Sequence, residues 1–455
     1  MKILLVQPAK PEKALGGEDF SIFEPLALEY LAAGVAGDHD VRILDMRLDS
    51  DLDAVLRKYQ PEVVGITAYT VHVNTVKRLF EHIKTVNPEI VTVAGGHHAT
   101  ILPEDFHTPF IDVIVAGEGV FAFREVILRL EKNLPVPGVP GAVSLSHGAV
   151  MIRQPDQNLD LDAMPFPRRD LTATYRTSYF SEWMRPLASI RTSKGCHFRC
   201  QFCALWKLTG GRYFTRKPER IVEELGAIEE KYVFFADDES LLDTERMAAL
   251  ADLIQRAGID KRFFLYGRSD TIARHPELLE KWKKAGLERV FVGLECIRDA
   301  DLKLIRKGST VENNLSAVRI LKELDIDIWP MFLVRPEFDR RDFADLRQYC
   351  LSMDLPFIGF SVLTPLPGTD LYDEVKDRLI TANYDFFDFF HTLLPTTLPV
   401  TDFYRELANL FKHSRSLKNQ LRLMAKYRLR DLPSLLRAYG GLMSRLKDLS
   451  EDYAG

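Results

Sequence analysis

The chain has 455 residues, of which 46% are hydrophobic and 27% charged, and its formal net charge at pH 7 is only -5. This length exceeds one ordinary domain core, and the nearly balanced charge gives no general attraction to nucleic acid. The apolar run at residues 1–6 is too short for a signal peptide, and no window approaches the roughly 18 apolar residues of a membrane-spanning helix. We therefore expect a cytoplasmic α/β protein of two or three domains.

Residues 1–135 alternate short β-branched runs with amphipathic stretches, which predicts a doubly wound, Rossmann-like parallel sheet with helices on both faces. In such sheets, ligands bind at the carboxyl ends of the strands. Strands are expected at 3–6, 41–44, 63–67, 90–94 and 113–116, and helices near 24–36, 51–59, 71–86 and 119–132.

Residues 136–183 carry prolines at intervals and little helical periodicity, so we expect a connector, with a small hairpin formed by 141–145 and 149–153. A second alternation occupies residues 184–383 and predicts a complete or partial TIM-type barrel of six strand–helix units. Its strands are expected at 188–192, 233–236, 263–267, 289–293, 328–334 and 357–363, and its helices near 217–230, 243–257, 275–284, 298–306, 311–324 and 340–352.

Residues 384–455 are helical in propensity and locally basic. Between Asn409 and Arg430 there are seven Lys or Arg residues and no acidic one, beside an imperfect apolar stripe. The plainer interpretation is the solvated face of a packing helix. The sharper one is a basic amphipathic helix that makes peripheral contact with an anionic membrane surface.

Three of the five cysteines, Cys196, Cys200 and Cys203, crowd into one loop directly after the first expected barrel strand. An odd set with this spacing suits a reducing cytosol and a metal site better than a disulfide framework. Three thiolates can bind three irons of a [4Fe-4S] cluster and leave the fourth iron open. A zinc site would need a fourth ligand, for which the neighbouring His197 is poorly placed. The other two cysteines are expected in the core.

The CxxxCxxC spacing, with an aromatic residue before the last cysteine, closely resembles the signature of the radical S-adenosylmethionine (SAM) superfamily. The resemblance implies that the open iron binds the methionine part of SAM. Electron transfer from an external one-electron reductant of the flavodoxin or ferredoxin type would then cleave SAM to a 5'-deoxyadenosyl radical.

Further motifs stand where the same resemblance places contacts to SAM. Asp237-Asp238-Glu239 departs from the Gly-Gly-Glu segment that often receives the methionine amino group, although an Asp can still accept hydrogen bonds from an ammonium. An exposed strand-end charge is the other interpretation of Arg268. The implied contacts are Phe202 and the Thr364-Pro365 backbone for adenine, Asp237 and Asp238 for the ammonium, Arg268 for the carboxylate and Glu295 for the ribose hydroxyls.

Residues 1–375 together resemble the cobalamin-dependent branch of that superfamily. There is no GxGxxG after the first strand, which argues against a dinucleotide, and no DxHxxG to supply an axial histidine. Cobalamin would therefore bind with its base displaced and its lower face against residues 69–72 or a water. A loop histidine as cobalt ligand and a degenerate, empty domain are alternatives. The implied cobalamin contacts are Thr67, Tyr69, Thr70, Gly95, Gly96, His97, Gly117, Glu118 and Gly119.

The resemblance is strongest to hopanoid C-3 methylases and implies a methyltransferase that acts on an unactivated carbon of a small-molecule or lipid-like substrate. A radical route suits such a carbon because no protein base can deprotonate it. Alternatives are a cyclase or rearrangement enzyme without methyl transfer, and a non-catalytic cobalamin or iron–sulfur sensor. The aromatic residues that could line the substrate pocket are Trp206, Tyr213, Phe291 and Phe332.

Overall fold

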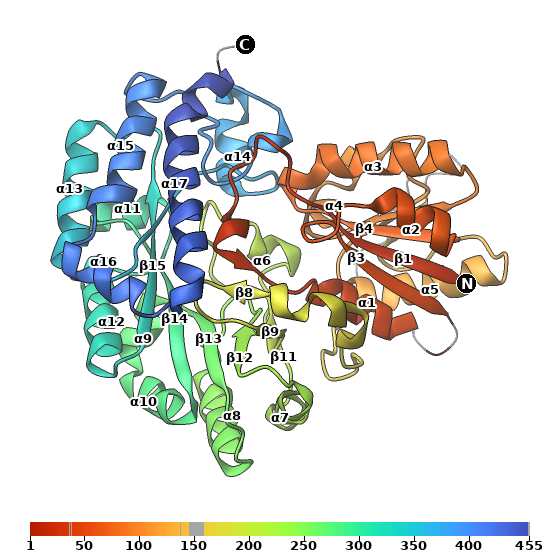
Figure 1. The fold of residues 1–455 in the computed structure, drawn as a ribbon, viewed down its shortest axis with the longest axis horizontal. Coiled ribbons are helices and arrows are strands. Elements are labelled where there is room, and N and C mark those ends of the chain that lie inside the picture. The colour runs from red at the N-terminus through yellow and green to blue at the C-terminus, as the bar shows by residue number, and fades with distance from the viewer. Residues whose placement is uncertain (36, 38, 137, 145–158, 454–455) are drawn as a thin grey trace.

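The computed structural model describes residues 1–35, 37, 39–136, 138–144 and 159–453 (Figure 1). Two sheets with helices around them stand side by side, and a group of helices at the C-terminus packs on the second sheet. The α/β class predicted from the alternation of strands and helices is therefore confirmed.

The first sheet has the strand order β3-β1-β4-β5-β6-β7, and its first five strands are parallel. The chain runs from β1 to β3 on one side and then to β4 on the other side of β1. Such a change of direction opens a ligand crevice at the carboxyl edge of the sheet. Buried aliphatic side chains fill both faces under the helices. The elements are β1 Lys2–Gln7, α1 Leu26–Val35, β3 Asp40–Asp45, α2 Leu52–Tyr59, β4 Val63–Thr67, α3 Val73–Val86, β5 Val91–Gly95, α4 His97–Ile101, β6 Val113–Val115, α5 Gly119–Glu131 and β7 Ala142–Ser144.

The first sheet extends past residue 135, because β7 adds to it as an antiparallel edge strand beside β6. Its residues are those of the first arm of the predicted hairpin. The turn and the second arm, 145–153, lie outside the described residues. The connector also contains a 3-10 helix at Arg169–Ser178. This helix was not predicted, because the sequence of the connector lacks the 3.6-residue periodicity of an α-helix.

The second sheet has six parallel strands in the order β9-β12-β13-β14-β15-β16, and its two edge strands do not pair within the described residues. It is thus the partial form of the predicted barrel. The elements are β9 Leu187–Ile190, α6 Leu205–Leu208, α7 Pro218–Ala227, β12 Tyr232–Phe235, α8 Thr244–Arg256, β13 Arg262–Gly267, α9 Ser269–Arg274, α10 Pro276–Ala285, β14 Leu287–Glu295, α11 Asp299–Leu304, α12 Val311–Glu323, β15 Asp327–Val334, α13 Arg340–Ser352, β16 Gly359–Val362 and α14 Asp370–Val375.

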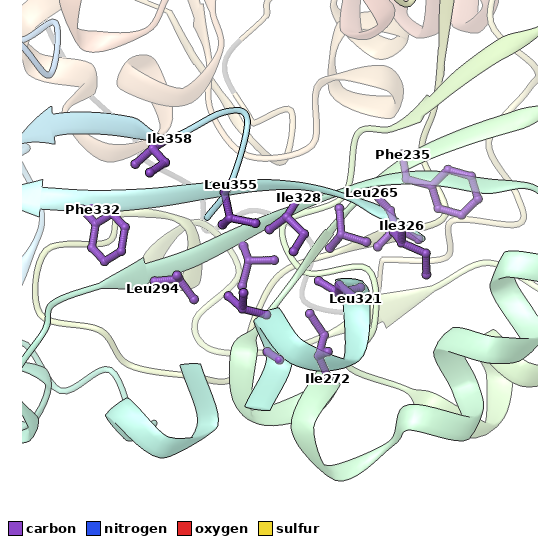
Figure 2. Close-up of a cluster of buried hydrophobic side chains, with 14 of the residues drawn as sticks. Phe235, Leu265, Ile272, Leu294, Leu321, Ile326, Ile328, Phe332, Leu355 and Ile358 are labelled. Carbon is purple, nitrogen blue, oxygen red and sulfur yellow. The ribbon is translucent and has the colours of Figure 1, made fainter. Parts of the chain in front are cut away.

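Alternation along these strands separates two apolar clusters. The outward-facing set, which includes Leu265, Ile328 and Phe332, packs under the helices and is fully or almost fully buried (Figure 2). The inward-facing set is aromatic and includes Phe234, Phe264 and Phe291. Phe332, a predicted pocket residue, therefore belongs to the outer core, because it follows the parity of Ile328 rather than that of Trp329.

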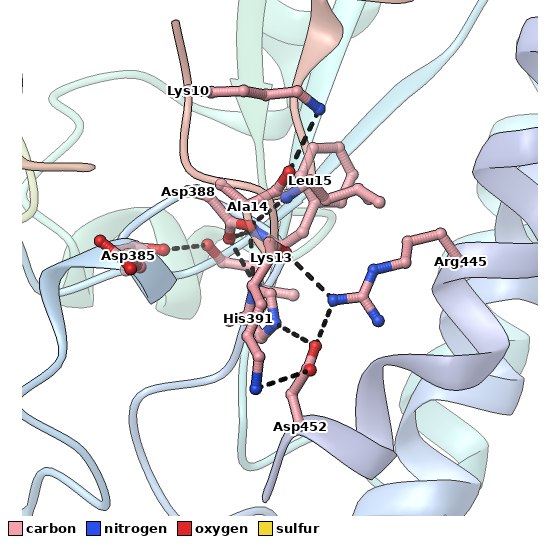
Figure 3. A network of polar contacts seen from close by, with 12 residues as sticks. Lys10, Lys13, Ala14, Leu15, Asp385, Asp388, His391, Arg445 and Asp452 are labelled. Carbon is pink, nitrogen blue, oxygen red and sulfur yellow. Dashed lines mark hydrogen bonds and ion pairs between the residues drawn. The ribbon is translucent and has the colours of Figure 1, made fainter. Parts of the chain in front are cut away.

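The predicted helical C-terminal region consists of α15 Val400–His413, α16 Leu417–Met424 and α17 Leu432–Asp448. A buried polar cluster fastens it to the rest (Figure 3): His391 contacts Asp388 through Nδ1 at 2.8 Å and Asp452 through Nε2 at 3.1 Å. Asp388 also accepts a hydrogen bond from the Leu15 backbone of the first domain. In the described part of the chain no helix is long and apolar enough to cross a bilayer.

Buried charges join the first domain to the barrel. Glu24, just before α1, accepts hydrogen bonds from the Ser189 backbone of β9 and from Arg176 of the connector. Arg169 of the connector pairs at 2.7 Å with Glu224 of α7, which also pairs with Arg216. Because each carboxylate is compensated, removal of one partner would leave a buried charge unpaired, which costs several kcal/mol. The network therefore holds the two sheets in one relative orientation.

Glu29 lies in this network with a carboxyl that is fully buried. Thr172 donates to its Oε1 at 2.5 Å, while its Oε2 has no hydrogen-bond partner among the described residues. Burial, followed by the charge of Glu24, raises the pKa of Glu29 to about 8.

A carboxyl whose pKa is raised by folding stabilises the protein most at low pH, and this contribution is lost as the pH rises from about 4.5 to about 8. We expect Glu29→Gln, which stays neutral, to remove part of the fall in melting temperature of the native protein between pH 5 and pH 8. Thermal melts across this range test the prediction. The exposed Glu81→Gln of α3 is the matched control, and an unchanged slope in Glu29→Gln would contradict the assignment.

Candidate functional site

The carboxyl edges of the two sheets meet. Gly368, in the loop after β16, has φ +80°, and a Cβ there would lie 2.3 Å from a side-chain carbon of Ile101 at the end of α4. Tyr384 donates a hydrogen bond of 2.6 Å to Asp105 of the first domain. Loops at the ends of strands from both domains thus share one interface, which is where each fold type places its ligands.

Glu118 joins these two edges by charge. Its carboxylate lies 2.8 Å from Lys194 and 3.3 Å from Arg191, which both follow the first barrel strand and lead into the cysteine loop. The two cations hold the pKa of Glu118 at about 2 despite burial. The Gly117-Glu118-Gly119 loop is therefore tied directly to the cysteine loop, a link that the sequence did not indicate.

The cysteine loop is held in place by its backbone. Gly195 has φ +93°, and a Cβ there would come within 2.0 Å of the Arg212 carbonyl oxygen, so only glycine fits. Asp237 accepts hydrogen bonds from the backbone of Thr192 and Ser193 at 2.7 and 2.8 Å. Gln201 anchors the far side of the loop by donating its backbone N–H to Ile305.

All three loop cysteines are free thiols. Burial raises the pKa of Cys196 to about 11 and that of Cys203 to about 12, although the backbone N–H groups of Phe198 and Leu205 act in the opposite direction. Such thiols become thiolates only when a cation compensates the charge, as iron does in a cluster. Each thiolate would bind its own iron, so the three sulfurs need not converge on one point. Among the described residues, no three His, Cys, Asp or Glu side chains are placed to share one metal ion.

The residues predicted to contact SAM gather at the same carboxyl edge. Asp238 accepts a hydrogen bond of 2.7 Å from the Gly195 backbone, while both oxygens of Asp237 are already engaged with Thr192 and Ser193. Phe202 packs beside Leu363 and Cys296 in a small apolar cluster, next to the buried Thr364 and Pro365.

Arg268 is buried beside the cysteine loop rather than exposed. Its guanidinium lies 3.5 Å from the ring centre of Phe198 and 4.0 Å from the Cys200 sulfur, and it donates to Asp270 and to the Lys307 carbonyl. The interpretation of Arg268 as a solvated strand-end charge is therefore wrong, because the side chain folds back over the loop.

Lys307 is a site residue that sequence reasoning missed. Its ammonium lies 2.7 Å from Glu295, and both side chains are buried at the end of β14. Glu295 itself has φ +63°, a conformation that non-glycine residues adopt rarely and mostly at functional positions. The pairing was not readable from the sequence, because Lys307 lies in the loop after α11 with no motif around it.

The predicted cobalamin loops bring the rings of Tyr69 and His97 together. Tyr69 is 51% exposed, yet burial by the surrounding protein raises its pKa, and its ring lies 4.7 Å from that of His97. His97 is also exposed, yet burial lowers its pKa to about 4. Tyr69 and Asp238 contribute to the raised pKa of Tyr266 on the barrel side. Side chains from the two domains therefore lie near one another at this edge.

The backbone of these loops approaches its neighbours closely at a glycine. Gly96 has φ +99°, and a Cβ there would lie 2.6 Å from the Thr67 hydroxyl, so this glycine lets β5 and β4 end close together. Gly117 also has positive φ. Of the histidines, His98 is buried with Nδ1 against Thr70 and Nε2 against Asp105, so neither nitrogen is free for a metal.

The inner face of the barrel forms an aromatic floor below this edge. Tyr266, Phe291, Trp329 and Met331 point inward and remain partly exposed, whereas their outward neighbours are buried. At the amino end, Arg289 closes the barrel: it is fully buried, paired with Glu182 at 2.7 Å and Asp327 at 3.0 Å. The inner face of the barrel is thus aromatic, and the Arg289 ion pairs fill its amino end.

Comparison with known proteins agrees with this geometry. The B12 binding domain model matches residues 12–127, and the Radical SAM superfamily model matches residues 190–350. The chain is 32% identical to the hopanoid C-3 methylase of Methylococcus capsulatus over 96% of its own length and 86% of that protein. The chain belongs to the cobalamin-dependent radical SAM enzymes.

Two more relatives of this family are informative. The anaerobic magnesium-protoporphyrin IX monomethyl ester cyclase of Rubrivivax gelatinosus is 26% identical over 86% of this chain and 72% of its own. The structure of the cobalamin-dependent SAM radical enzyme OxsB shares the fold, with a TM-score of 0.70 over 90% of this chain and 66% of that one, at 17% identity. The cofactors of this enzyme are a [4Fe-4S] cluster, SAM and cobalamin, as predicted.

The steric requirement at Gly195 gives a test of the cysteine loop. We expect Gly195→Ala to bind much less iron after anaerobic reconstitution, because its Cβ would collide with the Arg212 carbonyl and displace the loop. Gly210→Ala is the matched control, since Gly210 also has positive φ but has open space around its Cβ. Equal iron and sulfide contents in the two variants would contradict this reading of the loop.

Proposed function

We propose that this enzyme transfers a methyl group to an unactivated carbon of an apolar, lipid-like small molecule. The observation that carries the proposal is the meeting of the two carboxyl edges, where Glu118 of the first domain pairs with Arg191 and Lys194 beside the cysteine loop. A carbon held there would be within reach of both the radical-forming edge and the methyl-carrying edge. A polar methyl transfer is ruled out for such a carbon because no side chain can remove its proton at pH 7.

When bound, the cluster and SAM supply the radical that removes a hydrogen atom, and cobalamin supplies the methyl group. We propose that Cys196, Cys200 and Cys203 hold the cluster and that Arg268 screens its negative charge. The three thiolates would then be compensated on one side by iron and on the other by the guanidinium near Cys200.

For SAM, we propose that Asp238 receives the ammonium, because one of its oxygens is free of the loop contacts that engage both oxygens of Asp237. Asp237 then shapes the loop. Glu295 would hold the ribose, with Lys307 fixing its carboxylate. The carboxylate of SAM would face Arg268, and its adenine would lie against Phe202, Thr364 and Pro365.

For cobalamin, we propose that Thr67, Tyr69, Thr70, Gly95, Gly96, His97, Gly117 and Gly119 line the binding surface and that Tyr69 covers the lower face. Glu118, included in the same set from the sequence, would act by holding this surface against Arg191 and Lys194. Because burial lowers the pKa of His97 to about 4, its ring is neutral at pH 7 and can accept a hydrogen bond or donate one.

The aromatic floor supports an apolar substrate. Phe291 lies 5.7 Å from Trp329 and 4.9 Å from Tyr266 between ring centres, and these rings face inward with little polar competition. The proposed one-electron reductant is an external protein of the flavodoxin or ferredoxin type. The expected peripheral contact with a membrane stays a prediction.

The test uses SAM with a trideuterated methyl group, a chemical reductant, hydroxocobalamin and a hopanoid as trial substrate, so that SAM is the source of every transferred methyl group. We expect a product that carries the labelled methyl group, together with 5'-deoxyadenosine and S-adenosylhomocysteine in equal amounts. Cys200→Ala should lose all three products, whereas Cys350→Ala, which changes a core thiol far from the loop, should retain them.

Other outcomes would select the alternatives. If 5'-deoxyadenosine forms and the substrate is altered without labelled methyl, the enzyme is a cyclase or a rearrangement enzyme, a reaction class represented among its relatives. If neither 5'-deoxyadenosine nor S-adenosylhomocysteine forms with any substrate, the protein is a sensor and the proposal fails.

A further inference from the structure

The most exposed large apolar side chains of the described residues lie together in one segment near the C-terminus. Leu429 is 86% exposed, Leu417 71%, Leu421 58% and Leu436 57%. Single exposed leucines are ordinary, but a group of four within two helices and their short link marks a contact surface. Leu417 and Leu421 stand one helical turn apart on α16, so they share a face.

Basic residues accompany these leucines. Lys418 and Arg422 stand one turn apart beside them on α16, and Arg430 and Arg437 flank the start of α17. Nearby acids engage Arg422 and Arg430 only loosely, at 3.7 Å from Asp354 and 3.9 Å from Asp431.

Lys418 and Arg437 make no ion pair with any described residue. The segment therefore presents apolar and cationic groups together, with few anions.

The segment is fastened to the barrel, so the surface is a fixed one. Asn419 donates to Asp354 at 2.7 Å, and Tyr439 of α17 donates to the Phe411 carbonyl at 3.1 Å. Lys426, in the link between α16 and α17, pairs with Asp327 at the start of β15. That residue lies at the amino end of the barrel, opposite the cysteine loop. Figure 1 shows α16 on the outside of the barrel, whereas α17 reaches the N-terminal segment of the first domain, where Arg445 donates a hydrogen bond to the Lys13 carbonyl.

We propose that this basic leucine patch, formed by Leu417, Leu421, Leu429 and Leu436 with Lys418, Arg422, Arg430 and Arg437, docks on an anionic membrane surface. The leucines would enter the boundary between headgroups and acyl chains, and the basic side chains would bind the acidic headgroups. The occupant is a lipid surface rather than another protein because cations surround the apolar side chains, as anionic headgroups require. Docking by this end leaves the cysteine loop free to meet a reductant.

The proposal rests on the proposed function in one respect only, namely that docking would give access to a lipid-like substrate. Its test does not depend on methyl transfer. The full-length protein is sedimented with vesicles of phosphatidylcholine alone and of phosphatidylcholine with one quarter phosphatidylglycerol. We expect at least tenfold more bound protein on the anionic vesicles, and most of that difference should disappear in 0.5 M NaCl because salt screens exposed charges.

Two sets of variants separate the apolar and the charged contributions. Leu421→Ser with Leu429→Ser should lower binding to anionic vesicles at least tenfold, and so should Lys418→Glu with Arg437→Glu. Leu134→Ser is the matched control, since this leucine is 52% exposed at the end of the first domain. These side chains are exposed, so melting temperatures should be unchanged.

Equal binding to neutral and anionic vesicles, or binding by both double variants at the native level, would overturn the proposal. A concentration-dependent dimer in analytical ultracentrifugation that Leu421→Ser with Leu429→Ser abolishes would also overturn it, because a second copy would then cover the patch. Membrane binding without methyl transfer would leave the docking intact and refute the proposed reaction alone.

Discussion

The structure depends on buried ionic contacts that hold two parallel sheets with their carboxyl edges together. Parallel strands always present their loops at one edge, but nothing in either sheet alone orients that edge toward the other domain. Glu24 does so at the base of the interface through Ser189 and Arg176, and Glu118 does so beside the cysteines through Arg191 and Lys194. The two carboxyl edges, which would otherwise be separate, therefore meet at one interface.

Local sequence patterns predicted the main strands and helices of both sheets to within a few residues, because burial on both faces of a parallel sheet imposes that pattern. The cysteine spacing pointed to the cluster for a similar reason, since its three ligands lie in one loop. Gly96 differs, because its close neighbour is the Thr67 hydroxyl at the end of another strand. The short helices α4, α6 and α9 were not predicted.

Contacts between distant segments were not readable from the sequence. Lys307 beside Glu295, and Glu118 between Arg191 and Lys194, join charges that no motif connects. Phe291 and Phe332 looked equivalent as aromatic residues in strands, yet the parity of each strand sends one to the inner face and the other to the outer core. Arg268 was ambiguous for the same reason, because its environment is made by Phe198, Asp270 and Lys307 together.

The Arg289 cluster makes the two ends of the barrel unequal. At the amino end, a fully buried guanidinium is neutralised by Glu182 and Asp327, so protein fills that end. At the carboxyl end, Glu118 of the first domain reaches the loop that carries the cysteines. Traffic to and from the aromatic inner face is thus expected on the side where the loops of both domains meet.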